Sequence, residues 1–208
     1  MRGSLIVLII FAAGIFIGLG GIAAGSRLPA DLGEWLLYAL IIQIGLNLGY
    51  GGNISMLIKR ISWRTMLLPL ATIVGTLLFS VLAGLCLGEW SVTDSLALGS
   101  GLGYYSLSSV LIIDIKSHLT SVEAATRLGM LALLVNIVRE MTALICGPWF
   151  AKVFGKYAPI SAAGVTSMDV TLPMIIRCVG TEAAPMALIH GMVLEISVPL
   201  LVTLFAGL

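Results

Sequence analysis

The sequence predicts an all-α membrane protein, a polytopic helix bundle in which one or two helices are discontinuous, either broken or re-entrant. Of the 208 residues, 59% are hydrophobic and only 10% are charged, whereas a soluble domain is about a quarter charged. The mean hydropathy is +1.12. So few charges cannot cover the surface of a soluble enzyme. A formal net charge of +1 also excludes a nucleic-acid-binding protein.

The first half of the chain contains four long segments without charge. A helix needs about 20 apolar residues to cross a bilayer, and each segment is of that length. Their bounding charges are Arg2–Arg27, Glu34–Lys59, Arg64–Glu89 and Asp94–Asp114. Because several spans follow the first segment, we interpret it as a retained helix rather than a signal peptide. Residues 1–208 are read as a single transmembrane transporter domain.

In the second half, each apolar segment carries an ion near its middle. Arg139 and Glu140 interrupt one segment, Asp169 the next and Glu195 the last. An ionised side chain at the bilayer centre costs about 2.5–3.5 kcal/mol on insertion scales. We therefore expect Glu140 and Asp169 to face the protein interior or a wet cavity and to have a function. Glu195 is a weaker candidate, because a modest shift of helix boundaries would bring it towards the headgroups.

A glycine-rich run, GSGLGYYSLSS at residues 99–109, predicts the first break. Three alternating glycines cost a helix about 1 kcal/mol each relative to alanine. At membrane depth such backbone is tolerated only where it is buried in protein or lines a cavity. We expect its freed N–H groups to bind a ligand; close helix packing through small residues is the alternative. The candidate residues are Gly101, Gly103, Tyr105, Ser106 and Ser108.

A re-entrant segment between Asp94 and Asp114 also agrees with the charge pattern. Lys59, Arg60 and Arg64 form the strongest basic loop, which the positive-inside rule places in the cytoplasm. A re-entrant segment would return the next basic loop, with Lys152 and Lys156, to the same side.

Small and polar residues fall on one face of the predicted helix around Glu140. They recur at three- and four-residue steps, and they are Gly129, Ala132, Asn136, Glu140, Ala143 and Gly147. Bulky apolar residues, including Val138 and Ile145, occupy the other face. The pattern predicts that Asn136 and Glu140 point into the bundle.

A proline predicts the second break. Pro173 removes a backbone donor and clashes with the carbonyl four residues earlier, which belongs to Asp169. Ser167 and its neighbours can satisfy backbone groups around that opening. A glycine-rich break together with a proline-and-acid break indicates a transport site.

Two further polar positions are weaker candidates. Asn47 and Gln43, four residues apart, either line the same cavity or hydrogen-bond between helices. His190 is either a binding residue or a satisfied packing residue. The three cysteines have no paired spacing, so we expect no disulfide and no metal or cofactor site.

Two rival interpretations belong to other functional classes. An intramembrane hydrolase would use Ser106, Ser108 or Ser109 as nucleophile and His190 as base, but no G-x-S-x-G motif is present. A passive scaffold subunit would leave the ions in mid-membrane unexplained. We therefore expect a transporter rather than an enzyme.

The sequence resembles the LysO-type lysine exporters of bacterial inner membranes. The resemblance covers most of the chain and rests on four runs, of which the third is the most specific. They are GLGYYSLS at 101–108, Arg139-Glu140, GVTSMDVTLP at 164–173 and ALIHG at 187–191. It implies export of L-lysine and its toxic analogues across the inner membrane, with Glu140 and Asp169 as the intramembrane acids.

Two departures from the family pattern bear on partners and substrate range. Longer members carry an additional N-terminal membrane region, so a separate small membrane subunit is a candidate partner; a homo-oligomer is also compatible. Asn47 stands where we would expect glutamine, and Asn136 stands where some members have an acid.

The expected mechanism follows from the charges of lysine, a zwitterion with an extra ammonium. Asp169, aided by Glu140, would receive an ammonium, and opened N–H groups from Gly101 to Ser106 and at Ser167 would receive the carboxylate. A carboxylate that takes either a proton or an ammonium gives proton antiport, with sodium as the alternative coupling ion. A carrier for small organic anions is the runner-up.

Overall fold

The computed structural model describes residues 63–208 and six isolated positions before them. The first two predicted spans, between Arg2 and Arg27 and between Glu34 and Lys59, lie outside the described residues, as do Gln43 and Asn47. Residues 63–208 form helices and no strand, which confirms the all-α fold class.

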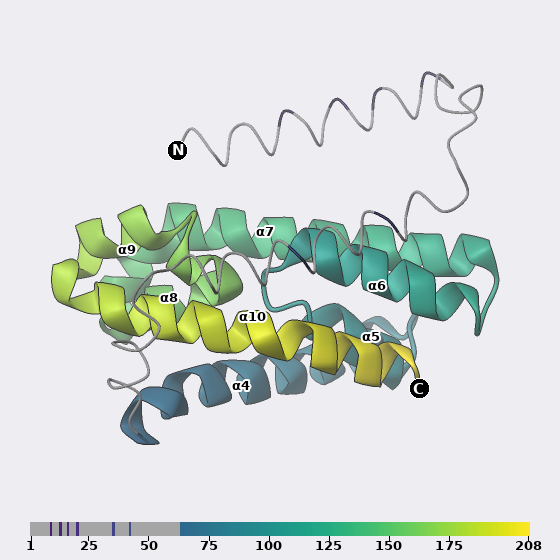
Figure 1. Cartoon of the computed structure of the whole chain (residues 1–208), viewed down its shortest axis with the longest axis horizontal. Helices are drawn as coiled ribbons and strands as arrows, with labels where there is room; N and C mark the ends of the chain where they lie inside the picture. The colour runs from purple at the N-terminus through teal and green to yellow at the C-terminus, as the bar shows by residue number, and fades with distance from the viewer. Residues whose placement is uncertain are drawn as a thin grey trace.

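Three of the described helices are long and apolar enough to cross a membrane. They are α4 (Trp63–Leu87), α7 (Val122–Phe154) and α10 (Ala184–Ala206), and they run the length of the bundle (Figure 1). The other helices rise about 1.5 Å per residue and are too short to cross a hydrocarbon core of about 30 Å. These are α5 (Val92–Gly99), α6 (Tyr105–Ser117), α8 (Ala158–Ala163) and α9 (Leu172–Val179), with the 3₁₀ helices η2 (Gly164–Met168) and η3 (Thr181–Ala183).

Helices α5 and α6 form a re-entrant hairpin, called hairpin 1. The chain reverses between them at residues 100–104, where Leu102 and Gly103 adopt positive φ values of 47° and 100°. An ion pair of 2.9 Å joins Lys116 Nζ in the last turn of α6 to Asp94 Oδ1 in the first turn of α5. The start of α5 and the end of α6 therefore lie at the same end of the bundle. This confirms the predicted break.

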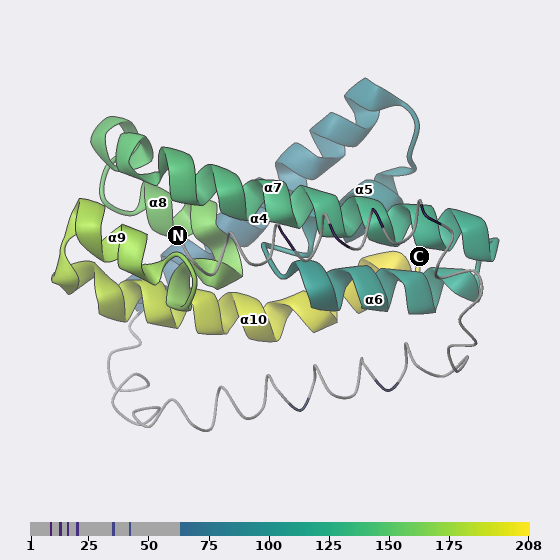
Figure 2. The same cartoon turned by 90° about the horizontal axis from the view of Figure 1, so that it is seen from above.

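Helices α8 and α9, with η2 between them, form hairpin 2. Pro173 lies in the first turn of α9, where a missing N–H is tolerated, and Asp169 ends η2 just before it. The predicted opening of the helix near Asp169 is thus confirmed. Hairpin 2 enters the bundle from the end opposite to hairpin 1, and the two views agree on this (Figures 1 and 2).

Helix α7 runs past both hairpins and presents the predicted face to them. Every residue of the small and polar set from Gly129 to Gly147 is buried. On the other face, Val138 and Ile145 are 54% and 77% exposed, as expected for side chains that meet lipid. The hydrophobic core packs against this arrangement in two clusters, one around Leu107 and Leu194 and one around Ile160 and Ile175.

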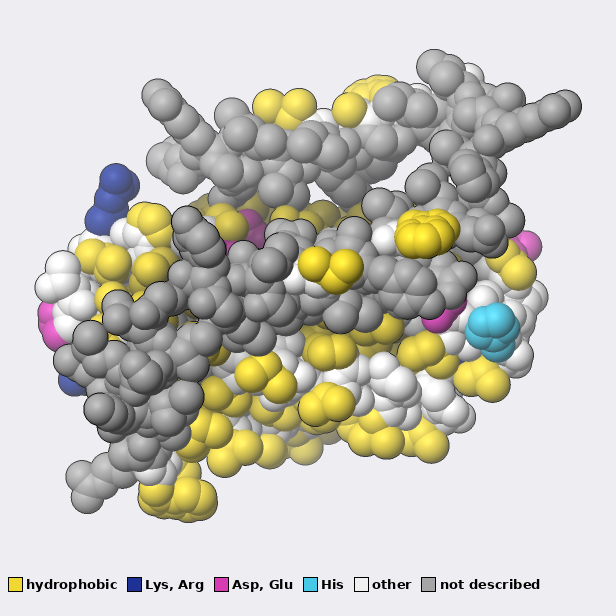
Figure 3. Space-filling view, viewed as in Figure 1, with side chains coloured by type: hydrophobic (Ala, Val, Ile, Leu, Met, Phe, Trp, Pro, Cys, Tyr) yellow, Lys and Arg dark blue, Asp and Glu magenta, His cyan; other side chains and the backbone are white. Residues whose placement is uncertain are grey.

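The re-entrant path of hairpin 1 brings the basic end of α7 to the end of the bundle where α4 begins (Figure 1). Lys152 and Lys156 therefore lie at the same end as the chain entering α4, as the charge pattern required of a re-entrant segment. Where described residues are visible, hydrophobic side chains cover much of the surface between the two ends, and the visible Lys and Arg side chains lie at the end where hairpin 2 lies (Figure 3).

We predict that the ion pair at the base of hairpin 1 stabilises the fold at neutral pH. Burial tends to raise the pKa of Asp94, but hydrogen bonds from Ser91 and Lys116 and the charge of Lys116 together lower it below its usual value. A carboxyl with a lowered folded-state pKa stabilises the fold above its unfolded-state pKa, and this contribution is lost as the pH falls through the folded-state value. Asp94→Asn should therefore cost about 0.5–1 kcal/mol at pH 7, since the pair is partly exposed.

The measurement is the thermal unfolding midpoint in detergent at neutral and at strongly acidic pH. The difference between wild type and Asp94→Asn should vanish below the folded-state pKa of Asp94. Asp114→Asn is the control, because the Asp114 side chain is exposed and makes no ion pair with a described residue. Equal effects of the two substitutions would show that the ion pair does not stabilise the hairpin.

Candidate functional site

The tips of the two hairpins meet in the middle of the bundle. The Val165 N–H donates to the Leu102 carbonyl at 2.9 Å, so hairpin 2 binds the backbone of hairpin 1 directly. Gly164 has a φ of 67°, and a side chain on it would collide with the same carbonyl. Gly103, opposite, would meet the Ala163 carbonyl at 3.0 Å. The contact therefore requires glycine on both tips.

Asn136 of α7 holds the tip of hairpin 1. Its Oδ1 accepts from the Gly103 N–H at 2.7 Å, and its Nδ2 donates to the Ala132 carbonyl at 2.9 Å. A longer bond of 3.4 Å runs from Nδ2 to Ser108 Oγ, which itself donates to the Tyr104 carbonyl. Asn136 and Ser108, both predicted to bind substrate, are thus engaged in supporting the turn.

Two buried glutamates lie beside this junction, and each has at least one carboxyl oxygen without a hydrogen-bond partner among the described residues. Glu140 on α7 is 1% exposed, and neither of its carboxyl oxygens has a partner among the described residues. Glu195 is 2% exposed, and its Oε2 likewise has none. Glu195 lies in the middle of α10 and is buried, so it is a stronger candidate than the sequence indicated. A last span drawn over the whole of α10 would have placed Glu195 at its centre.

Asp169 lies close enough to both glutamates for their charges to interact. Its side chain, unlike that of Glu140, is exposed, so of the two surroundings expected for these acids Asp169 does not have a closed protein interior. The reason is local: Asp169 ends η2 with φ −132° and ψ −92°, and its Oδ1 accepts the N–H of the next residue, Val170. The junction thus combines two buried acids with one accessible acid.

The backbone N–H groups expected to bind the substrate carboxylate are largely occupied. Those of Gly101, Gly103 and Tyr104 donate to Leu98, Asn136 and Gly101 respectively. The role predicted for Gly101 and Gly103 as N–H donors to a ligand is therefore not supported. Tyr105 and Ser106, half-buried in the first turn of α6, follow a residue that provides no side-chain cap, so that turn retains open N–H groups.

His190 and Ser167 belong to a buried chain of hydrogen bonds. His190 Nδ1 pairs with Ser167 Oγ at 3.1 Å, and Nε2 pairs with Thr72 Oγ1 at 3.0 Å. Thr72 in turn meets Ser161 Oγ at 2.8 Å. His190 is fully buried and hydrogen-bonds neither Ser106, Ser108 nor Ser109. The nucleophile–base pair of the hydrolase hypothesis is therefore absent from the described residues.

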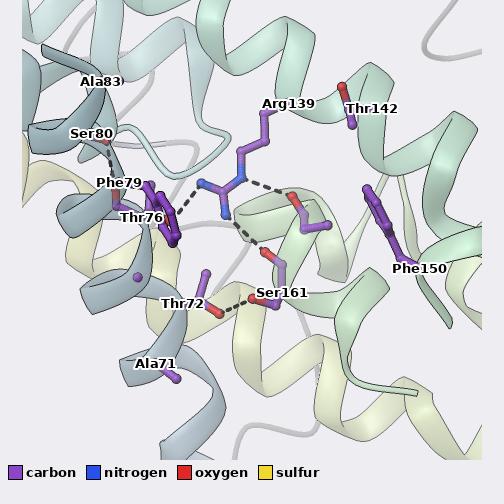
Figure 4. A pocket seen from close by; sticks show the side chains of 12 residues that line it. Ala71, Thr72, Thr76, Phe79, Ser80, Ala83, Arg139, Thr142, Phe150 and Ser161 are labelled. Carbon is purple, nitrogen blue, oxygen red and sulfur yellow. Dashed lines mark hydrogen bonds between the residues drawn. The ribbon is translucent and has the colours of Figure 1, made fainter. Parts of the chain in front are cut away.

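Arg139, next to Glu140 in the sequence, points into a different part of the protein. Its guanidinium donates to the Ala162 and Ser161 carbonyls at 3.0 Å each and to Thr76 Oγ1 at 3.3 Å. It lines a cavity between α4, α7 and α8 (Figure 4). The α4 wall of this cavity was not predicted from the sequence, although Thr72, Thr76 and Ser80 recur every four residues within an otherwise apolar span.

Residues 63–208 contain no group of three or more His, Cys, Asp or Glu placed to hold a metal ion.

We predict that the tip contact depends on the left-handed backbone of Gly164. Gly164→Ala should destabilise the protein by roughly 1–3 kcal/mol, through backbone strain and loss of the bond to Leu102. The measurement is the thermal unfolding midpoint in detergent. Gly75→Ala is the matched control, since a Cβ at Gly75 meets nothing within 4 Å; an equal loss in both variants would contradict the prediction.

Comparison with known proteins gives a consistent match over nearly the whole chain. The profile of the family described as Lysine exporter LysO matches residues 8–206. The lysine exporter LysO of Escherichia coli (strain K12) is 28% identical over 196 residues, which cover 93% of this chain and 61% of that protein. A putative lysine exporter of Haemophilus influenzae is 29% identical over 179 residues, which cover 86% of each chain. This chain thus spans less than two thirds of the first relative, and no solved structure matches it.

Proposed function

Because this chain belongs to the lysine exporter LysO family, we propose that it exports L-lysine and lysine analogues across the bacterial cytoplasmic membrane. The proposed mode is exchange of the substrate for a proton at Glu140, Asp169 and Glu195. The protein is then a transporter rather than an enzyme, and its membrane-crossing helices are consistent with that class.

The observation that carries the proposal is a pair of buried glutamates: among the described residues, Glu140 has no hydrogen-bond partner on either carboxyl oxygen, and Glu195 has none on Oε2. A buried carboxylate is stable only when it is neutralised by a proton or paired with a cation. Glu140 has neither a donor nor a basic partner among the described residues. Each state of the site therefore requires either a bound proton or a bound cation, which is the property that an exchanger needs.

The exposed carboxylate of Asp169 completes this mechanism. An ammonium reaching the junction meets Asp169 first and can pass to Glu140 or Glu195, whose charges already interact with it. Three acids at one place favour a cationic group over an organic anion. Sodium is the alternative coupling ion, because carboxylate oxygens suit it as well.

We predict that neutral isosteres of the acids lose export without losing the fold. Leaving a buried ammonium unpaired costs about 2–5 kcal/mol, so Glu140→Gln should slow lysine efflux at least about tenfold. Asp169→Asn should abolish it, and Glu195→Gln should slow it comparably. The measurement is growth on lysine dipeptide of a strain sensitive to lysine, and efflux of labelled lysine. Both are made with and without any small membrane partner encoded beside the gene.

Glu123→Gln is the matched control, because Glu123 is an exposed acid in the first turn of the same helix as Glu140. It should leave efflux unchanged at equal protein abundance in the membrane. Near-normal efflux from Asp169→Asn would remove Asp169 from the mechanism.

We further predict that efflux responds to a proton gradient. In proteoliposomes loaded with labelled lysine, a lower pH on the side to which lysine leaves should accelerate wild-type efflux, because protons displace the ammonium there. Glu140→Gln should weaken that response. If the wild-type rate ignores the pH gradient and follows a sodium gradient, the coupling ion is sodium.

A further inference from the structure

The cavity beside Arg139 has the size and wall chemistry of a small-molecule site. Its volume is about 570 Å³, within the range of roughly 300–1,000 Å³ that is usual for such sites. One wall is a single face of α4, where small and hydroxyl side chains recur at three- and four-residue steps together with the aromatic ring of Phe79. Helices α7 and α8 form the other walls (Figure 4). The α4 residues are Ala71, Thr72, Gly75, Thr76, Phe79, Ser80 and Ala83.

Arg139 is a cation without an anionic partner among residues 63–208. All three of its hydrogen-bond acceptors are neutral, two carbonyls and one hydroxyl. A guanidinium has five N–H donors in a planar fork, so two remain, one on each terminal nitrogen. A charge at this depth is costly unless it is paired, and the open side of the guanidinium faces the cavity.

We propose that this cavity binds the carboxylate of a free amino acid, with Arg139 as the group that recognises it. The inference rests on the proposed function and adds to it the site for the substrate's negative end. A carboxylate fits the remaining N–H pair of an arginine. The hairpin junction is a poor alternative, because its three acids would repel a carboxylate and its tip N–H groups are largely occupied.

The cavity is also connected to the hairpin junction. Ser161 and Thr72 both line it, and the hydrogen-bond chain from them passes through His190 to Ser167 in η2. Arg139 itself binds the last carbonyls of α8, at the entrance to the same tip. A ligand on Arg139 therefore contacts the elements that position Asp169.

A cysteine reporter tests the site without relying on transport. Thr142→Cys, on an exposed cavity-lining residue, is made in a background where Cys86, Cys146 and Cys178 are serine. The rate of modification by an anionic methanethiosulfonate reagent is then measured on the purified protein. L-lysine and 6-aminohexanoate, which keep the carboxylate, should protect; at ten times the half-protecting concentration the rate should fall about tenfold. Cadaverine, which lacks the carboxylate, should not protect.

Two variants then assign the effect to Arg139 and to the cavity. Arg139→Gln should abolish protection by both carboxylates. Arg139 also hydrogen-bonds two carbonyls of α8, so Arg139→Gln could disturb the fold. Gly75→Leu is therefore the second variant: it fills the cavity from a position where an added Cβ meets nothing within 4 Å. It should reduce lysine efflux at least about tenfold, whereas Val74→Leu, on the adjacent exposed residue, should not.

The outcomes separate this inference from the proposed function. If carboxylates and cadaverine protect equally, or Gly75→Leu exports normally, the carboxylate site is wrong, and the effect of Glu140→Gln on efflux still decides the exporter proposal. If the carboxylates protect through Arg139 but the wild-type protein releases no lysine, the amino-acid site stands and the exporter proposal fails.

Discussion

The contact between the two hairpin tips is the constraint on which the rest of the structure depends. Neither hairpin crosses a membrane, so both leave polar backbone at mid-depth, where an unsatisfied group costs several kcal/mol. The bond from the Val165 N–H to the Leu102 carbonyl and that from the Gly103 N–H to Asn136 satisfy these groups mutually. Leu102 accepts a left-handed backbone, with φ 47°, to make this possible. Two hairpins that enter from opposite ends thus reach across the bundle together, with the polar groups of their tips hydrogen-bonded.

The same contact explains why the functional groups gather where they do. Asp169 ends η2 because the proline that starts α9 prevents the helix from continuing, and η2 is held in place by hairpin 1. Helices α7 and α10 pass this point without interruption, and each contributes one buried glutamate to it. The acids thus lie where the hairpins entering from both ends of the bundle meet.

Much of this arrangement could be predicted from local signals. The alternating glycines at 99–103 and Pro173 predicted the two helix breaks. The three- and four-residue steps around Glu140 predicted the buried face of α7. What could not be predicted depends on tertiary contacts. Asp169 lies between η2 and α9, where φ and ψ are irregular, and no periodic pattern in the sequence predicts the exposure of such a position. Asn136 was predicted to bind substrate, and its support of the hairpin turn could not be predicted. The reason is that its hydrogen-bond partner, the Gly103 N–H, is 33 residues away in sequence. The Thr72, Thr76 and Ser80 pattern was readable, but a span without charges offers no reason to suspect a cavity.

The adjacent residues Arg139 and Glu140 show how one helix can serve two sites of opposite charge. With 3.6 residues per turn, neighbours in sequence point about 100° apart, so Glu140 faces the junction while Arg139 faces the cavity beside α4 and α8. A direct ion pair between them would have neutralised both charges and left neither available to a ligand. Under the two proposals above, their separation leaves an acid for an ammonium and a guanidinium for a carboxylate. A zwitterion with an additional ammonium is a molecule that needs both, whereas a simple cation or a simple anion would need only one.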